Sequence, residues 1–200
     1  MIITVLGASG RAGSEITQEL ATRGHTVTAI ARNPEAIPTG PGITAVKGDA
    51  SDPMALAALI KGSEAVISAL HFDVTAETLL SALKAAGVPR LLVTGGAASL
   101  EVAPGIRLID TPEFPDEWKP FAQGGIAFLN DIRSETDIDW TFFSPAAVIE
   151  QTPRLGHFRT GTDQLIVDDN GESRIGFSDY AIAMVDELET PRHSRARFTA

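Results

Sequence analysis

The chain has 200 residues, of which 44% are hydrophobic and 21% are charged, a composition sufficient for one well-buried domain. Its 16 basic and 26 acidic residues give a formal net charge of -10, which argues against a sequence-independent nucleic-acid binder. The absence of cysteine excludes disulfides and thiolate metal sites, and the four histidines are too scattered to predict a metal site.

Short apolar, β-branched runs alternate with helix-like segments through the first half of the chain. Strands are expected at residues 2–6, 26–30, 43–47, 65–70 and 90–94. The segments between them carry apolar residues at helical spacing and end at Gly24, Gly62 and Gly87. Strands buried on both faces and alternating with helices predict an α/β fold, a Rossmann-type doubly wound parallel sheet with helices on both faces.

The second half of the chain is less regular. A sixth strand is expected at 140–145, a strand, turn and return across 164–177, a helix that starts at Ser178, and a last strand at 195–200. The proline-rich segment 104–120 is expected to be a loop over the carboxyl edge of the sheet. The chain is therefore expected to be a single domain over residues 1–200, with a cofactor-binding core at 1–149 and a small C-terminal, substrate-side portion at 150–200.

The first expected strand begins at once, at Ile2, and no basic leader precedes it. Apolar runs such as 65–70 are far too short to span a bilayer. These observations predict a cytoplasmic protein that has no membrane or nucleic-acid partner.

The stretch GASGRAG, residues 7–13, directly follows a predicted strand and opens a predicted helix. Gly7 would allow the sharp turn, Gly10 would let the backbone approach a pyrophosphate, and Gly13 would let the helix pack against the strand. The N-terminus of that helix offers unpaired N–H groups and a partial positive charge to phosphates. The motif in this setting predicts dinucleotide binding.

The glycine spacing is Gly-x-x-Gly-x-x-Gly, which differs from the standard dehydrogenase fingerprint. With it come AIARNP, VKGDASDP, AVISAL, LLVTGGAASL and DWTFFSPA, in this order up to residue 149, and the tail GESRIGFSDYAIAMVDELE. In these pieces the chain resembles the atypical branch of the short-chain dehydrogenase/reductase superfamily. That branch is the NAD(P)H-binding group that includes NmrA-like proteins and the flavin reductase (biliverdin-IXβ reductase) type.

The end of the second predicted strand bears on the choice of nicotinamide cofactor. An NAD-preferring fold usually has an acidic residue there, whereas this chain has Arg32 and Asn33, and its first acid is Glu35. The guanidinium of Arg32 would suit a 2′-phosphate, and Arg11 could close on the same group. We predict NADP(H) over NAD(H); the alternative is that both arginines are solvated surface residues.

The resemblance implies further cofactor contacts at the ends of the other strands. It places Asp49 and Ala50 on the adenine side and the end of the fourth strand near the ribose and pyrophosphate. Gly95 and Gly96 would admit the nicotinamide ribose. The predicted cofactor-binding residues are Gly7, Ser9, Gly10, Arg11, Ala12, Gly13, Arg32, Asn33, Asp49, Ala50, Ala69, Leu70, His71, Gly95, Gly96 and Pro145.

The tyrosine and lysine with which typical members of the superfamily reduce carbonyls are missing. The only tyrosine is Tyr180, and Met184 stands four residues beyond it. The segment where the catalytic helix should lie contains Pro120 and Gly124-Gly125, which predict a poor or interrupted helix. His71 and Lys119 remain as candidate catalytic residues, although a hydrogen-bonded loop histidine and a solvated loop lysine are the plainer interpretations.

Two functions fit these observations. The first is an NADPH-dependent reductase of a small conjugated acceptor, such as a flavin or quinone, which takes hydride directly while solvent supplies the proton. Phe114, Trp118 and Phe121, and the segment 157–159, could wall a slot for that acceptor. The alternative is a non-catalytic NADP-binding redox sensor of the NmrA-like type. The partner expected is a small-molecule acceptor, and the assembly a monomer or homodimer.

Two charged segments near the C-terminus have structural interpretations. The alternation in RARF, residues 195–198, predicts arginines on the solvated face of an edge strand. The acidic run around Asp168, Asp169 and Glu172 surrounds Asn170-Gly171 and predicts a hairpin turn in preference to a cation site.

Overall fold

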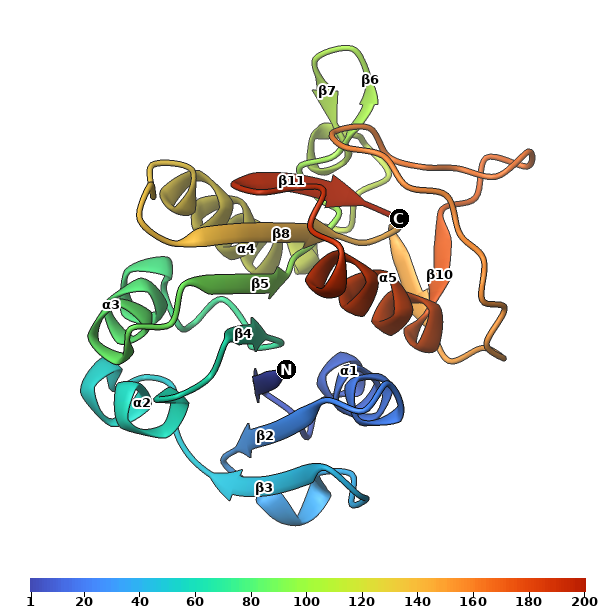
Figure 1. Cartoon of the computed structure of the whole chain (residues 1–200). Helices are drawn as coiled ribbons and strands as arrows, with labels where there is room; N and C mark the ends of the chain where they lie inside the picture. Colours follow the sequence, from blue (N-terminus) through green and yellow to red (C-terminus); the bar gives the residue numbers. More distant parts are fainter.

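Seven parallel strands form the central sheet of the computed structural model, which describes residues 1–200 (Figure 1). Their order across the sheet is β11-β8-β5-β4-β1-β2-β3, and every neighbouring pair is parallel. This is the predicted doubly wound sheet. The strands are β1 (Ile2–Leu6), β2 (Thr26–Ala31), β3 (Ile43–Lys47), β4 (Ala65–Ser68), β5 (Arg90–Thr94), β8 (Asp139–Ser144) and β11 (Ala196–Thr199).

Helices cover both faces of the sheet, and each face has its own apolar core. The helices α1 (Arg11–Thr22) and α5 (Phe177–Glu189) pack side by side on one face. The other face carries α2 (Pro53–Ile60), α3 (Ala76–Ala86) and α4 (Lys119–Ile132). In Figure 1 the first pair lies to the right of the sheet and the other three helices to its left. Because both faces are covered, the central strands β1, β4, β5 and β8 are buried along nearly their whole length and are mostly apolar.

The helix boundaries follow the predicted start and stop signals at most positions. The Asp52 carboxylate caps α2 by accepting from the N–H groups of Met54 and Ala55, at 2.9 and 3.2 Å. Gly87, at φ +71°, ends α3 in the left-handed conformation. The start of α5 differs from the prediction: Gly176 is its N-cap, and Ser178 lies inside the first turn with a buried, unpaired hydroxyl.

The expectation of an interrupted helix at residues 119–132 was wrong, because α4 is continuous. Pro120 stands in the first turn, where a proline costs no helical hydrogen bond. Gly124 and Gly125 are explained by the packing of α4 against Phe72. A Cβ on Gly124 would lie 3.2 Å from Cβ of Phe72, and one on Gly125 would lie 2.9 Å from its Cε2. Both glycines therefore let α4 approach the Phe72 ring closely.

The return strand predicted near residue 174 exists, but its predicted partner was wrong. β10 (Arg174–Gly176) pairs in parallel with β9 (Val148–Glu150), and residues 164–169 form no strand. The predicted turn does form, since the Asp168 carboxylate accepts from the N–H groups of Asn170 and Glu172, each at 2.8 Å. The side-chain hydrogen bonds fix the turn without a hairpin ladder behind it.

The segment between β5 and α4, where a loop was expected over residues 104–120, contains a small hairpin and two three-residue helices. Its antiparallel strands are β6 (Glu101–Ala103) and β7 (Ile106–Arg107), which project beyond the sheet at the top of Figure 1. The 3-10 helices η2 (Leu108–Asp110) and η3 (Asp116–Trp118) lead into α4, and a further one, η1 (Pro34–Ala36), follows β2.

The prediction that both arginines of RARF lie on a solvated face was half wrong. Arg195 is exposed, but Arg197 is buried. Arg197 pairs with Asp163 and donates to the Ser99 hydroxyl at 2.8 Å. A two-way backbone bridge between Gly161 and Thr199 also covers this strand. The excursion 151–173 therefore shields the sheet edge that the sequence pattern left open.

No helix of the molecule combines the length and apolar character needed to cross a bilayer.

Candidate cofactor and acceptor site

The strand order reverses between β1 and β4, which makes the carboxyl ends of these strands the switch point of the sheet. The loop GASGRAG lies at the end of β1, directly beside the end of β4. A Cβ on Gly7 would lie only 2.4 Å from the carbonyl oxygen of Ala69. Gly7 also has φ +75°, a backbone conformation that favours glycine. Both the close contact with Ala69 and this conformation therefore require glycine at the predicted sharp turn.

The other glycines of the loop allow the chain to turn back over itself. A Cβ on Gly13 would lie 2.2 Å from the Gly7 carbonyl oxygen, and one on Gly10 would lie 3.3 Å from it. The backbone N–H groups of Gly7 and Ala8 donate to the Ile30 carbonyl at 3.0 and 3.1 Å, which ties the loop to β2. The loop is thus held in shape by the protein itself.

The N-terminus of α1 leaves hydrogen-bond donors free. Gly10 is the N-cap and supplies no side-chain acceptor, and the first turn contains no acidic residue. The backbone N–H groups of Arg11, Ala12 and Gly13 donate to no protein acceptor. Ser9, Gly10 and Arg11 are exposed. This cradle of aligned, unpaired donors fits an anionic group such as a pyrophosphate.

Arg32 and Asn33 follow β2 directly and are both exposed. Asp49, two residues beyond β3, accepts from the Ser51 N–H at 2.9 Å. This bond and, to a smaller extent, the charge of Arg32 hold the pKa of Asp49 below its ordinary value. Arg11 is directed elsewhere, because its guanidinium lies over the Phe177 ring at 5.2 Å. The guanidinium that stands beside the end of β3 is therefore that of Arg32.

The remaining residues predicted to contact the cofactor lie at the carboxyl edge of the sheet, but they differ in exposure. Ala50 and Pro145 are buried, whereas Ala69 and Leu70 are partly exposed. A Cβ on Gly95 would lie 2.1 Å from Cε1 of Phe142, while one on Gly96 would meet nothing within 4 Å. Gly95 is thus explained by packing, and Gly96 opens onto free space.

Next to Gly96 lies a cavity of about 810 Å³, which we call the acceptor cavity. Its walls come from the segments that follow β4, β5 and β8, from the stretch between β7 and α4, and from the first half of α4. Most of its surface is apolar. It is lined by His71, Phe72, Asp73, Gly96, Ala97, Ala98, Ser99, Leu108, Thr111, Glu113, Phe114, Pro115, Trp118, Pro120, Phe121, Ala122, Gly124, Gly125, Ile126, Ala147 and Val148.

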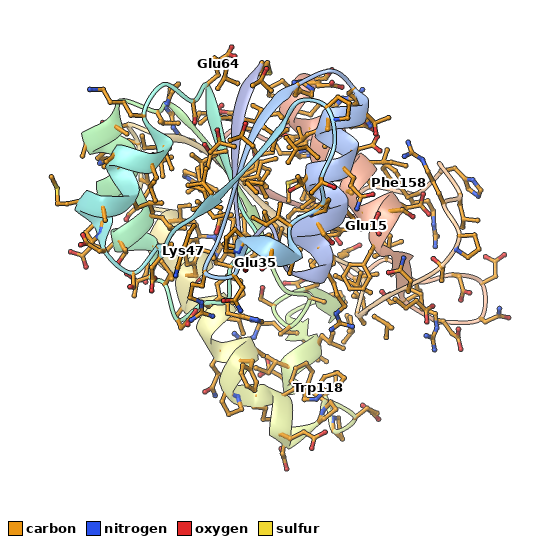
Figure 2. The ribbon with its side chains drawn as sticks, turned by 90° about the horizontal axis from the view of Figure 1, so that it is seen from below. Glu15, Glu35, Lys47, Glu64, Trp118 and Phe158 are labelled. Atoms are coloured by element: carbon orange, nitrogen blue, oxygen red, sulfur yellow. The ribbon has the colours of Figure 1, made fainter.

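The aromatic residues expected to wall a slot are divided by the structure. Phe114, Trp118 and Phe121 line the acceptor cavity, and Trp118 and Phe121 are 55% and 75% exposed. Figure 2 shows Trp118 on the part of the molecule that projects away from the sheet, at the bottom of the view, and Phe158 well away from it at the right. Phe158 packs against the core under α1 and α5. The segment 157–159 therefore has no part in this cavity.

Of the two candidate catalytic side chains, only His71 lines the acceptor cavity. Lys119 pairs with Asp116, with 2.6 Å between Nζ and Oδ1, and lines a separate polar pocket of about 660 Å³. Tyr180 is fully buried and stacks on Phe143, with 4.2 Å between ring centroids. Burial raises its pKa far above the ordinary value, and Tyr180 does not line the acceptor cavity, so its hydroxyl is not placed to protonate an acceptor there.

Sequence reasoning missed several cavity residues, above all Phe72, Asp73 and Glu113. The signal in the sequence that could have indicated Phe72 was the pair Gly124-Gly125. These glycines suggest an interrupted helix, but in the structure they allow α4 to approach the Phe72 ring closely. Phe72 also stacks with Phe142, with 6.2 Å between centroids, and joins the floor of the cavity to the core.

A parallel sheet with a glycine cradle at its switch point defines the class of Rossmann-type nucleotide-binding proteins. Within this class, the chain belongs to the NAD(P)H-binding family, whose model matches residues 7–190. The resemblance to the NAD(P)H-binding group is thereby confirmed.

Three relatives are similar over nearly their whole length. The protein YwnB of Bacillus subtilis is 43% identical over 210 residues, which cover 100% of this chain and 97% of YwnB. A structure from Bacteroides thetaiotaomicron, provisionally named an epimerase, is 43% identical with a TM-score of 0.93, covering 99% of this chain and 95% of that one. A structure from Streptococcus pneumoniae, provisionally named an NADH-flavin reductase, is 32% identical with a TM-score of 0.87, covering 100% and 98%.

Proposed function

We propose that the protein is an NADPH-dependent reductase that transfers hydride directly to a small, planar, conjugated acceptor. The observation that carries the proposal is the apolar acceptor cavity, which opens at Gly96 beside the dinucleotide edge and contains no tyrosine–lysine pair. The provisional name of the Streptococcus pneumoniae relative agrees with this reaction class. The proposed reaction needs orientation and a dry slot more than it needs a side-chain acid.

The chain's own groups would divide the work between two regions. The free N–H groups of Arg11, Ala12 and Gly13 would bind the pyrophosphate, and the end of β5 would leave room for the nicotinamide ribose at Gly96. The reduced nicotinamide, when bound, supplies a hydride. The aromatic and aliphatic walls of the cavity would orient the acceptor and exclude water, and solvent or His71 at the wall would supply the proton.

Arg32 would select NADPH over NADH. The residue is exposed at the end of β2, where an acid would repel a 2′-phosphate. Arg32→Ala should weaken NADPH binding by about tenfold, the loss of one charge-assisted contact, and leave NADH binding nearly unchanged. Calorimetric titration of both cofactors measures this, with Arg133→Ala as the exposed-arginine control. Equal affinity of the wild-type protein for both cofactors would contradict the assignment.

The proposed reaction is tested by following the loss of reduced-nicotinamide absorbance with a panel of flavins, quinones and enones. Turnover of at least one planar acceptor, with NADPH preferred, is the expected result. Tight NADPH binding without turnover of any acceptor would instead favour the redox sensor of the NmrA-like type. Catalytic roles for His71 and Lys119, a monomeric or homodimeric assembly, and the cytoplasmic location stay predictions.

A further inference from the structure

We propose that the acceptor cavity selects uncharged planar acceptors over acceptors that carry a phosphate or another anionic tail. The inference rests on the proposed reductase function and specifies its substrate class. It starts from the distribution of charge around the cavity.

The charged side chains on the cavity wall are almost all acidic. Asp73 and Glu113 line it, both are exposed, and neither has an ion-pair partner. His71 is the single lining residue that can carry a positive charge, and no arginine or lysine is among them. Protein sites for phosphate ordinarily use arginine, lysine or free backbone donors, so the wall lacks the usual side-chain means of holding one.

The cationic side chains near the acceptor cavity do not provide a free positive charge for a phosphate. Arg107 and Lys119 line the adjacent polar pocket, which shares Thr111 and Ile126 with the acceptor cavity. Arg107 is paired with Asp110 at 2.7 Å, and Lys119 with Asp116 at 2.6 Å. Both charges are therefore already neutralised by carboxylates.

The helix α4 also offers little to an anion at this place. The N-terminus of α4 borders the cavity, but Pro120 in its first turn has no N–H to donate. The free donors of the glycine cradle would be taken by the cofactor in the proposed reaction.

The expected discrimination is moderate, because the two carboxylates are exposed to solvent. Repulsion between exposed charges at this range changes affinity or association by about three- to tenfold at low ionic strength. It should fade as salt shortens the screening length to about 10 Å at 0.1 M and less above it. The net charge of -10 acts in the same direction on an approaching anion.

Riboflavin and FMN provide the test, since they share one isoalloxazine ring and differ by a phosphate. At low salt the wild-type protein with NADPH should show a kcat/KM for riboflavin at least threefold above that for FMN. The ratio should approach one as potassium chloride is added. A ratio of one or less at low salt would overturn the proposal.

A charge-reversal pair separates the cavity from the surface as a whole. Glu113→Lys should raise kcat/KM for FMN about tenfold relative to riboflavin. Glu117→Lys makes the same change of charge four residues along, at an exposed position outside the cavity wall, and should alter the ratio less than twofold. Equal responses of the two variants would assign the effect to net charge and would contradict selection by the cavity.

Measurements of flavin binding without turnover test the selectivity of the cavity separately from the proposed reaction. Quenching of flavin fluorescence, in the presence of oxidised NADP, reports the affinities for riboflavin and FMN without turnover. Preferential riboflavin binding with no reduction of either flavin would support the selectivity and would contradict flavin as the acceptor of the proposed reductase. Absence of binding by both flavins would overturn the inference.

Discussion

Gly95 and Gly96 are adjacent, yet their surroundings give them different requirements. A Cβ on Gly95 would lie 2.1 Å from the buried Phe142 ring, whereas one on Gly96 would meet no atom within 4 Å. We expect Gly95→Ala to lower the free energy of unfolding by about 1–3 kcal/mol, the usual cost of overpacking.

Gly96→Ala is the matched variant for this pair. It should leave the free energy of unfolding within about 0.5 kcal/mol of the wild type. Because Gly96 lines the acceptor cavity, the added methyl should reduce NADPH oxidation. Urea unfolding and steady-state assays of both variants check the pair, and an equal loss of stability in the two would contradict the packing argument.

Tyr180 shows why a residue type alone does not identify a catalytic group. Its ring stacks on Phe143, and its buried hydroxyl faces Thr94 without a hydrogen bond of normal geometry. Tyr180→Phe should therefore keep the activity and change the free energy of unfolding by no more than about 1 kcal/mol. A loss of turnover with unchanged stability in this variant would restore a catalytic role for the phenol.

At the scale of elements, a buried carboxylate holds the C-terminal strand β11 against the sheet. Glu187 on α5 accepts from the backbone N–H and the Nδ1 of His193, at 2.9 and 2.8 Å, and pairs with the buried Arg90 at 3.4 Å. His193 in turn stacks on Phe198 of β11, with 4.8 Å between centroids. The network connects the helix, the last turn and the edge strand.

Removing this carboxylate would leave the N–H groups of Arg192 and His193 without their acceptor, and the buried Arg90 guanidinium with Asp139, at 3.1 Å, as its one remaining carboxylate. Glu187→Ala should lower the free energy of unfolding by about 1–3 kcal/mol, the usual cost of leaving buried hydrogen-bond donors unsatisfied. Glu172→Ala removes one carboxylate from the exposed pair with Arg174 and should cost about 0–1 kcal/mol. Denaturant unfolding measures both, and similar losses would contradict the buried network.

At the scale of the whole molecule, carboxylates that tie distant segments together predict acid sensitivity. Glu19 on α1 binds Arg154 of the excursion at 2.6 Å and Arg23 at 2.8 Å. Burial would raise its pKa, but the hydrogen bonds from Arg154 and Arg23 outweigh it and hold the pKa below the ordinary 4.5. Similar balances, between burial and hydrogen bonds to cations, lower the pKa values of Glu135 and Glu189.

A carboxyl group whose pKa is lower in the folded than in the unfolded chain stabilises the fold. This stabilisation is fully present at pH values above the pKa of the group in the unfolded chain. That stability is lost as the pH falls through the folded pKa. The free energy of unfolding should thus decline as the pH drops below about 4.5. Glu19→Gln should flatten this decline, whereas Glu77→Gln, at an exposed position of α3, should not. Identical pH profiles for the wild type and Glu19→Gln would contradict the linkage.

Sequence alone determined the parts of the molecule whose signals are local. Apolar runs of strand length, Asp52 before Pro53, and the glycine after each helix reflect short-range rules of burial and capping, and they predicted the sheet and α1, α2 and α3 closely. The stretch GASGRAG was likewise recognisable, because a tight turn onto a helix requires glycine at those positions whatever surrounds it.

Only the tertiary structure decided what depends on contacts between distant residues. The position of the Phe72 ring explains the glycines of α4. Arg197 is buried where it forms an ion pair with Asp163, and β10 pairs with residues Val148 to Glu150 and not with the residues that precede the turn. The acceptor cavity collects its wall from segments spread between His71 and Val148. No local pattern encodes such a surface, since a cavity is shaped by the packing of segments that are far apart in the chain.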